Sequence, residues 1–260
     1  TALNGMTSST SNSNYGKTGA IDFNNRRAMR SIYETEHRLL ATLRSKHYFF
    51  GADKPTTFTL IFERKSGLPA YPTFDTFTGR TSDYKARAFG YDYNLNDDSS
   101  SLLYIPTRND PLVCYSSSCR DEGSADALAR EEAVLNLLYN VFGLEGKAGQ
   151  IADRGSMRFP WQSSLDFKVT QILPGFRGDD EFVITLGIEN LLNLIDDDKG
   201  VVRYGYYSGR IPVIDLKIID GSRYDYSRNA FRYSFDDPYN MSLSATQSVW
   251  RAQLGIKYNF

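Results

Sequence analysis

The sequence predicts an all-β fold of antiparallel strands, and three observations support this prediction. Several segments alternate apolar and polar side chains, as a strand with one apolar and one polar face does. Aromatic residues stand at the ends of these segments, and the connections between segments alternate short and long. About six segments qualify, namely 1–8, 37–50, 56–64, 163–173, 182–188 and 248–260. Together these features are typical of a β-barrel that crosses a membrane.

The last segment, 248–260, shows the alternation most clearly. One face carries Trp250, Ala252, Leu254, Ile256, Tyr258 and Phe260. The other face carries Arg251, Gln253, Gly255, Lys257 and Asn259. A half-buried strand of a soluble β-sandwich shows the same period. The aromatic ends and a length close to the ~9–11 residues of a tilted transmembrane strand favour the membrane alternative.

The lengths of the connections predict the topology. Segments 49–55 and 174–180 are short, whereas 9–35, 66–160 and 194–247 are long. Outer-membrane barrels combine short periplasmic turns with long extracellular loops in this alternating manner. About six strands cannot close a barrel, since the smallest have about eight. We therefore expect residues 1–260 to be the C-terminal part of a larger barrel whose earlier strands lie outside this chain.

Two stretches resemble the closing strands of TonB-dependent receptors of bacterial outer membranes, in the Oar-like (OmpA-related) branch. The first is RGSMRFPWQSSLDFKVTQILPG followed by FVITLGIENLLNLI. It contains a D-x-(+)-x-(T/S) pattern at Asp166, Lys168 and Thr170, and then an E-N-L-L-N motif on the next strand at 189–193. The second is the alternating terminal strand ending in Phe260, which resembles the signature by which outer-membrane barrels are assembled.

This resemblance implies a 22-stranded barrel in the outer membrane, with a plug domain and an energy-coupling box upstream. The long loops would capture an unidentified ligand, and the barrel would import it. The implied partners are outer-membrane lipid, the remaining barrel strands, the barrel-assembly machinery acting on the terminal strand, and the TonB complex acting on the upstream part. A surface lipoprotein is a further partner in this scheme. The assembly residues would be Trp250, Leu254, Ile256, Tyr258 and Phe260.

A second function of a different class is an adhesin or anchor barrel that does not transport. Its loops would bind a surface partner through their many tyrosines, which number 18 in the whole chain. An upstream plug and TonB box support transport, and their absence supports the adhesin.

The composition narrows the function further. The chain has 31 Asp and Glu against 30 Lys and Arg, so no overall positive field indicates nucleic-acid binding. No apolar run approaches the ~18 residues of a transmembrane helix. The chain begins at Thr1 and no signal peptide is visible, so either processing has removed one or the chain is part of a longer protein; we favour the second alternative.

Two cysteines, Cys114 and Cys119, lie in a predicted extracellular loop. In an oxidising compartment the expected state is a loop-closing disulfide. A metal site would need more ligands, and the chain's two histidines, His37 and His47, lie on another predicted strand and at its end.

Polar side chains on the inward faces of three strands are candidates for a substrate path through a lumen. They are Asp166, Lys168, Glu189, Arg251 and Lys257. The acidic clusters 97–98, 179–180 and 196–198 lack the ligand spacing of an EF-hand and are interpreted as solvated turns. No nucleophile, metalloprotease or phosphate-binding motif is present, so we expect neither an enzyme nor a cofactor.

One helix is predicted within segment 66–160. Ser124 is a candidate N-cap, and Gly143 or Gly146 a candidate end. Its apolar stripe is expected to pack on the barrel rim, with a partner-binding helix as the alternative. In the same segment, 84–93 and 102–105 are expected to pair as a small hairpin.

Overall fold

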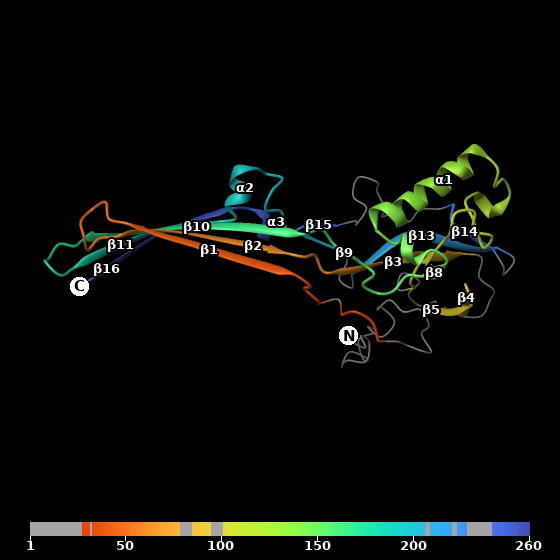
Figure 1. Cartoon of the computed structure of the whole chain (residues 1–260), viewed down its shortest axis with the longest axis horizontal. Coiled ribbons are helices and arrows are strands. Elements are labelled where there is room, and N and C mark those ends of the chain that lie inside the picture. Colours follow the sequence, from red (N-terminus) through yellow and green to blue (C-terminus); the bar gives the residue numbers. More distant parts are fainter. Residues whose placement is uncertain are drawn as a thin grey trace. The chain divides into compact units, whose positions relative to one another are not determined.

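Figure 1 shows the computed structural model of the chain, which is built mostly of β-sheet with few helices. The all-β prediction is confirmed at this level. The described strands form open sheets, and none of these sheets closes into a barrel. The segment 1–8 lies outside the described residues. The structure describes residues 28–31, 33–78, 85–94, 101–205, 209–219, 223–227 and 241–260.

The chain forms two compact units. We name the first the core unit; it comprises the described residues of Thr1–Glu34, Leu68–Phe159 and Gly205–Met241. We name the second the meander unit; it comprises Thr35–Gly67, Pro160–Tyr204 and Ser242–Phe260. Two long segments of the core unit are therefore inserted between strands of the meander unit.

The meander unit is one five-stranded antiparallel sheet in the order β1-β2-β10-β11-β16. Its strands are β1 (Arg38–His47), β2 (Thr56–Lys65), β10 (Gln162–Pro174), β11 (Glu181–Glu189) and β16 (Arg251–Asn259). All five correspond to predicted strands. The last begins later than predicted, because the short helix α3 (Ala245–Ser248) precedes it.

The register of this sheet aligns the apolar sides of all five strands. Residues opposite each other on neighbouring strands share a face. One such row reads Leu43, Leu60, Phe167, Ile188 and Ala252. The next row reads Arg44, Thr59, Lys168, Gly187 and Gln253. The sheet therefore has one apolar and one polar face.

The apolar face is defined by side chains from every strand of the meander. They are Leu39, Ala41, Leu43, Phe58, Leu60, Phe62, Leu165, Phe167, Val169, Leu173, Phe182, Ile184, Leu186, Ile188, Ala252, Leu254, Ile256 and Tyr258. The polar face is the opposite side, where Leu40, Ile61, Ile172 and Val183 are scattered among polar and charged residues.

The apolar face is left uncovered within the described structure. Leu43 is 66% exposed, and Leu254 and Ile256 are each 67% exposed. No side chain of the meander unit belongs to the buried hydrophobic core found among the described residues. The buried side chains of this unit are polar, namely Thr56, Ser66, Asp180, Asn190 and Ser248.

The core unit contains a second, mixed five-stranded sheet in the order β7-β14-β13-β3-β9. Its strands are β3 (Pro69–Thr78), β7 (Val113–Cys114), β9 (Met157–Arg158), β13 (Arg210–Ile219) and β14 (Arg223–Asp225). The long strands β3 and β13 pair in parallel, although one comes from each insertion. The two segments therefore connect strands of the meander unit, as predicted, but their described parts also pair with one another, which was not predicted.

Smaller sheets complete the fold. In the core unit, β4 (Lys85–Ala88) pairs with β5 (Tyr91–Asn94), and β6 (Tyr104–Ile105) pairs with β8 (Gln150–Ile151). In the meander unit, β12 (Arg203–Tyr204) pairs with β15 (Ser242–Leu243). The predicted pairing of 84–93 with 102–105 is wrong, because β4 turns back on β5 at the tight turn of Phe89 and Gly90.

Helix α1 (Ala125–Asn136) begins where it was predicted, and the Ser124 hydroxyl accepts the Ala127 N–H at its start. It continues as a π-helical turn over Leu137–Val141 and ends at Gly143, whose φ of +70° suits glycine. Leu138 is fully buried in the core unit. The prediction that this helix packs on a barrel rim is wrong, because it packs on the core of its own unit.

The buried core is contained in the core unit. It comprises Ala70, Tyr71, Phe74, Ala88, Leu102, Leu103, Tyr104, Ile105, Val113, Tyr115, Ala127, Val134, Leu137, Leu138, Phe142, Leu144, Ile151, Ala152, Met157, Phe159, Ile211, Val213, Ile214, Leu216, Tyr224 and Tyr226. Helices in the described part of the chain all fall short of the length and hydropathy that a membrane crossing requires.

Candidate functional site

The predicted lumen-lining residues all lie on the polar face of the meander unit. Glu189 at the end of β11 is opposite Arg251 at the start of β16. Lys168 lies in the middle of β10, opposite Gly187. Lys257 lies near the other end of the sheet, opposite Val183. The register therefore gathers residues from three strands on one surface.

Asp166 has a structural role at the end of β11. Its Oδ1 accepts the backbone N–H of Asn190 at 2.9 Å. Asn190 is buried and left-handed, with a φ of 54°, a conformation that asparagine tolerates well. Its Nδ2 donates to the carbonyls of Gly200 at 2.9 Å and Ser248 at 2.6 Å. Asp166 and Asn190 thus tie the end of β11 to the approach of β16.

The E-N-L-L-N motif does not continue the strand. β11 ends at Glu189, and Leu191–Ile195 form the short helix α2. The placement of the whole motif on the strand is therefore wrong, because the left-handed conformation of Asn190 ends the extended backbone. The aspartate of the first motif and the asparagine of the second are linked by the hydrogen bond described above.

Charged partners within the meander unit satisfy two further acids of the polar face. Arg38 Nε lies 2.8 Å from Glu63 Oε1, and Lys54 Nζ lies 2.6 Å from Glu181 Oε1. Five cations of the same face have no hydrogen-bond or ion-pair partner among the described residues, namely Arg44, Lys46, Lys65, Lys168 and Lys257. The polar face is therefore rich in uncompensated positive charge.

The middle of the polar face carries threonine hydroxyl groups and two glycines. Neighbouring strands place Thr57 beside Thr170, and Thr170 beside Thr185. The space above Gly187 and Gly255 is open, because an added Cβ would meet no atom within 4 Å. Hydroxyl groups and long cationic side chains therefore lie next to a part of the sheet surface that no side chain covers.

Aromatic rings mark both ends of the sheet. At the end with the short turns, Phe182 and Tyr258 have ring centroids 4.7 Å apart, and the Tyr258–Phe260 distance is 6.3 Å. At the opposite end, Trp161 stacks on His37 at 6.2 Å. His47, at the end with the short turns, lies against Phe58 at 5.8 Å. Both histidines thus have aromatic neighbours.

The predicted assembly residues occupy β16 and its two flanks. Leu254, Ile256 and Tyr258 lie on the apolar face. Trp250 lies one residue before the strand and Phe260 one residue after it. Both flanking rings are exposed, Phe260 fully so.

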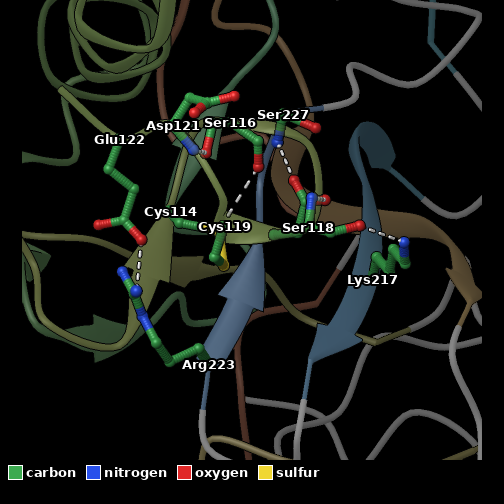
Figure 2. Close-up of a disulfide and its surroundings, with 10 residues drawn as sticks. Cys114, Ser116, Ser118, Cys119, Asp121, Glu122, Lys217, Arg223 and Ser227 are labelled. Atoms are coloured by element: carbon green, nitrogen blue, oxygen red, sulfur yellow. Dashed lines mark hydrogen bonds and ion pairs between the residues drawn. A yellow bond between two sulfur atoms is a disulfide. The ribbon is translucent and has the colours of Figure 1, made fainter. Parts of the chain in front are cut away.

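Cys114 and Cys119 are joined by a disulfide in the core unit, as Figure 2 shows. The loop between them is held by the buried carboxylate of Asp225, which accepts the Ser118 N–H at 2.8 Å and the Ser227 N–H at 2.7 Å. Lys217 Nζ donates to the Ser118 hydroxyl at 2.6 Å. The disulfide is thus integrated into the sheet through β13 and β14.

The same region contains the described residues with metal-ligand spacing. The sulfurs of Cys114 and Cys119 and a carboxylate oxygen of Glu122 lie within 4.8 Å of one another. The sulfurs form the disulfide, and Glu122 pairs with Arg223. This hydrogen bond raises the pKa of the Arg223 guanidinium above its ordinary value. The geometry favours a structural disulfide over a metal centre.

Sequence analysis missed a buried carboxylate in the core unit. Asp110 Oδ2 accepts the Tyr104 hydroxyl at 2.9 Å and the Thr107 N–H at 3.0 Å, while Oδ1 accepts the Leu112 N–H at 3.0 Å. Burial and this hydrogen bond raise the pKa of Tyr104 well above its ordinary value. The Asn109-Asp110-Pro111 sequence is a turn signature that could have indicated such a role.

Comparison with known proteins adds no identification. No protein-family model matches the chain, and no curated protein or solved structure matches it significantly.

Proposed function

We propose that the meander unit is part of the wall of a bacterial outer-membrane β-barrel, in a TonB-dependent transporter that imports an unidentified ligand. The single observation that carries this proposal is the uncovered apolar face, which runs across all five strands opposite a polar face. A barrel wall has lipid on one side and water on the other, and so requires this division.

The energetics of the apolar face support lipid contact. Full burial of one Leu or Ile side chain contributes about 1.5–3 kcal/mol relative to exposure in water. A continuous row of such side chains left in water forgoes that stabilisation at each position. Large exposed apolar patches are typical of membrane or protein interfaces, and the aromatic ends of this sheet suit the lipid–water boundary.

The dimensions of the strands also support a membrane crossing. β16 has 9 residues, β1 and β2 have 10 each, and β10 has 13. A tilted strand needs about 9–11 residues to cross the hydrocarbon layer. Each strand is therefore long enough to span it.

Both edges of the meander, β1 and β16, lack a neighbouring strand among the described residues. All ten residues of β1 are exposed. Unpaired edge strands expose backbone donors and acceptors, which lipid cannot satisfy. In our proposal, further barrel strands pair with both edges, and the barrel-assembly machinery acts on β16 before closure.

The connectivity of the meander defines its outer end. The short turns between β1 and β2 and between β10 and β11 lie at one end of the sheet, and both insertions leave from the other end. In outer-membrane barrels the short turns face the periplasm. In our proposal the core unit is therefore displayed outside the cell, where it captures ligand.

The adhesin remains a second candidate because of one observation. The inserted segments pair their long strands and enclose a hydrophobic core, with a disulfide close to it, and a folded module of this kind is suited to binding a surface partner. Transport needs an upstream plug and a TonB box, whereas adhesion needs neither.

Two measurements test the proposal. The first is membrane fractionation of the intact protein, with a gel that compares heated and unheated samples in detergent. We expect an outer-membrane location and a heat-shifted band, and a soluble protein without a shift would contradict the barrel. The second is in vivo cross-linking to TonB, which the transporter predicts and the adhesin does not.

A further inference from the structure

We infer that the polar face of the meander unit forms a path for a ligand that carries oxyanions, that is, carboxylate, phosphate or sulfate groups. This inference rests on the proposed function and adds the chemical class of the ligand. It derives from the distribution of charge and hydroxyl groups on the polar face, which no overall property of the chain reveals, since total acid and base nearly cancel.

Cations outnumber acids on the polar face. The cations are Arg38, Arg44, Lys46, Lys65, Lys168, Arg251 and Lys257. The acids are Glu63, Asp166, Glu181 and Glu189. The excess is therefore positive on the side of the sheet that our proposal assigns to water.

The protein itself already engages three of the four acids. Glu63 pairs with Arg38, Glu181 pairs with Lys54, and Asp166 accepts a backbone N–H. The fourth acid, Glu189, is opposite Arg251 in the register, but the Arg251 guanidinium donates to the Thr246 carbonyl. The positive charge of Arg44, Lys46 and Lys168 is not balanced in this way by any described residue. Their three charges are available to a ligand.

These three cations surround threonine hydroxyls. Arg44 and Lys168 flank Thr59 in a single row across the sheet. Two strand spacings place them about 10 Å apart at the backbone, and Lys46 follows Arg44 about 7 Å along the same strand. Long side chains from both sides can therefore approach one anionic group above Thr59, whose hydroxyl can donate a hydrogen bond.

The sheet surface beside this proposed anion position carries no large side chain. Gly187 and Gly255 expose backbone without side chains, and Gln253 lies next to Gly187 across the sheet. A low-dielectric wall behind a water-filled path strengthens the field of charges that line it. The arrangement matches an extended anionic ligand with several oxyanions.

The test uses the intact protein in detergent, with three anionic probes that distinguish the source of the charge. They are citrate, inorganic pyrophosphate and a trisulfonated pyrene dye, each titrated calorimetrically at low and high salt. We expect at least one probe to bind, and its affinity to fall as salt rises because mobile ions screen the interaction.

Arg44→Gln and Arg64→Gln provide a matched pair of variants. Arg44 lies on the polar face of β1, whereas Arg64 lies on the opposite side of the neighbouring strand β2, over Trp161. One charge near the ligand has an effect of roughly fivefold in affinity. We expect Arg44→Gln to weaken binding by that factor, Arg44→Gln/Lys168→Gln to weaken it further, and Arg64→Gln to change it less than twofold.

Three results would overturn the inference. If the heat-shifted band is present and TonB cross-linking succeeds but no anionic probe binds, the transporter proposal stands and the anionic path fails. Equal effects of Arg44→Gln and Arg64→Gln would show that the polar face is not the site. If the polar-face variants lower the thermal stability of the barrel instead of probe affinity, an acidic segment of the protein occupies this face.

Absence of a heat-shifted band would refute the proposed function itself.

Discussion

The two units use apolar side chains in opposite ways. The core unit encloses its apolar residues among three stretches of chain, and residues such as Ile214 and Leu138 are completely buried. The meander unit leaves its apolar residues on an open face and buries polar ones instead, such as Asn190 and Ser248.

This difference indicates that the two units have different surroundings, namely water around the core unit and lipid on the apolar face of the meander unit. A unit that buries apolar side chains derives its stability from water exclusion. A sheet that exposes them on one side needs an apolar environment there, and lipid provides one. We therefore expect substitutions in the two units to affect separate transitions, namely unfolding of the core unit and opening of the barrel.

The largest effect is expected from Leu138→Ala. Leu138 is fully buried, so its truncation removes transfer free energy and leaves a cavity, at a cost of about 2–5 kcal/mol. Limited proteolysis on heating should show earlier cleavage within the core unit, while the heat-shifted band of the barrel is unchanged. Leu128→Ala on the exposed side of α1 is the control and should have little effect. Simultaneous loss of both transitions would show that the units are not separable.

Leu254→Arg should instead destabilise the barrel and leave the unfolding of the core unit unchanged. Leu254 lies in the middle of β16 on the apolar face, and an arginine near the bilayer midplane costs about 2–4 kcal/mol in a barrel. Urea titration of the protein folded into vesicles measures this cost. The matched variant Gln253→Arg places the same side chain on the polar face and should be tolerated. Equal costs at the two positions would argue against lipid contact.

Replacement of both cysteines by serine is expected to destabilise the core unit by about 2 kcal/mol, because the disulfide closes a short loop and restrains the unfolded chain. The thermal step of the core unit should fall, and addition of a reductant to the wild-type protein should reproduce the change. The barrel transition should not move. A reductant effect in the double variant would show that the disulfide is not its cause.

The smallest effect concerns pH and Tyr115. Burial raises the pKa of Tyr115 well above its ordinary value of 10.0, so the folded protein keeps this phenol neutral. The stability that the folded protein gains by keeping Tyr115 neutral is complete below about pH 10. It is lost as pH rises further, because the Tyr115 phenol then ionises in the unfolded chain but not in the folded one. Tyr115→Phe should therefore reduce the loss of core-unit stability between pH 9 and pH 11, measured by thermal melts.

The same variant has a second expected property. The Tyr115 hydroxyl is buried and has no hydrogen-bond partner among the described residues. Its removal at pH 7 should therefore leave stability unchanged or slightly higher. A clear destabilisation at pH 7 would show that the hydroxyl has a partner after all.

The meander unit was predictable because its pattern is local. The period-two alternation in 163–173 and 248–260 defines each strand without knowledge of its neighbours. Strand limits were less predictable where short helices intervene, as at Ala245–Ser248. The end of the strand at the left-handed Asn190 was missed because the side-chain amide of this residue binds the carbonyls of Gly200 and Ser248, the second of which is distant in sequence.

The core unit was missed because its pairings are not local. β3 and β13 meet in parallel across more than a hundred residues, and no turn signal links them. The buried carboxylate of Asp225 accepts the Ser118 N–H, which only the folded chain brings near, whereas the backbone partners of Asp110 are local in sequence. The uncompensated cations of the polar face were likewise hidden, because their neighbours are defined by register rather than by sequence.

The central claim is that the apolar face of the meander unit contacts lipid. Spin labels placed one at a time at Gln253, Leu254, Ile256 and Lys257 of the intact protein in vesicles test it most directly, by collision with oxygen and with a water-soluble nickel complex. We predict that oxygen collisions dominate at Leu254 and Ile256, and nickel collisions at Gln253 and Lys257. Equal nickel accessibility at all four positions would contradict the claim, because both faces of β16 would then be in water.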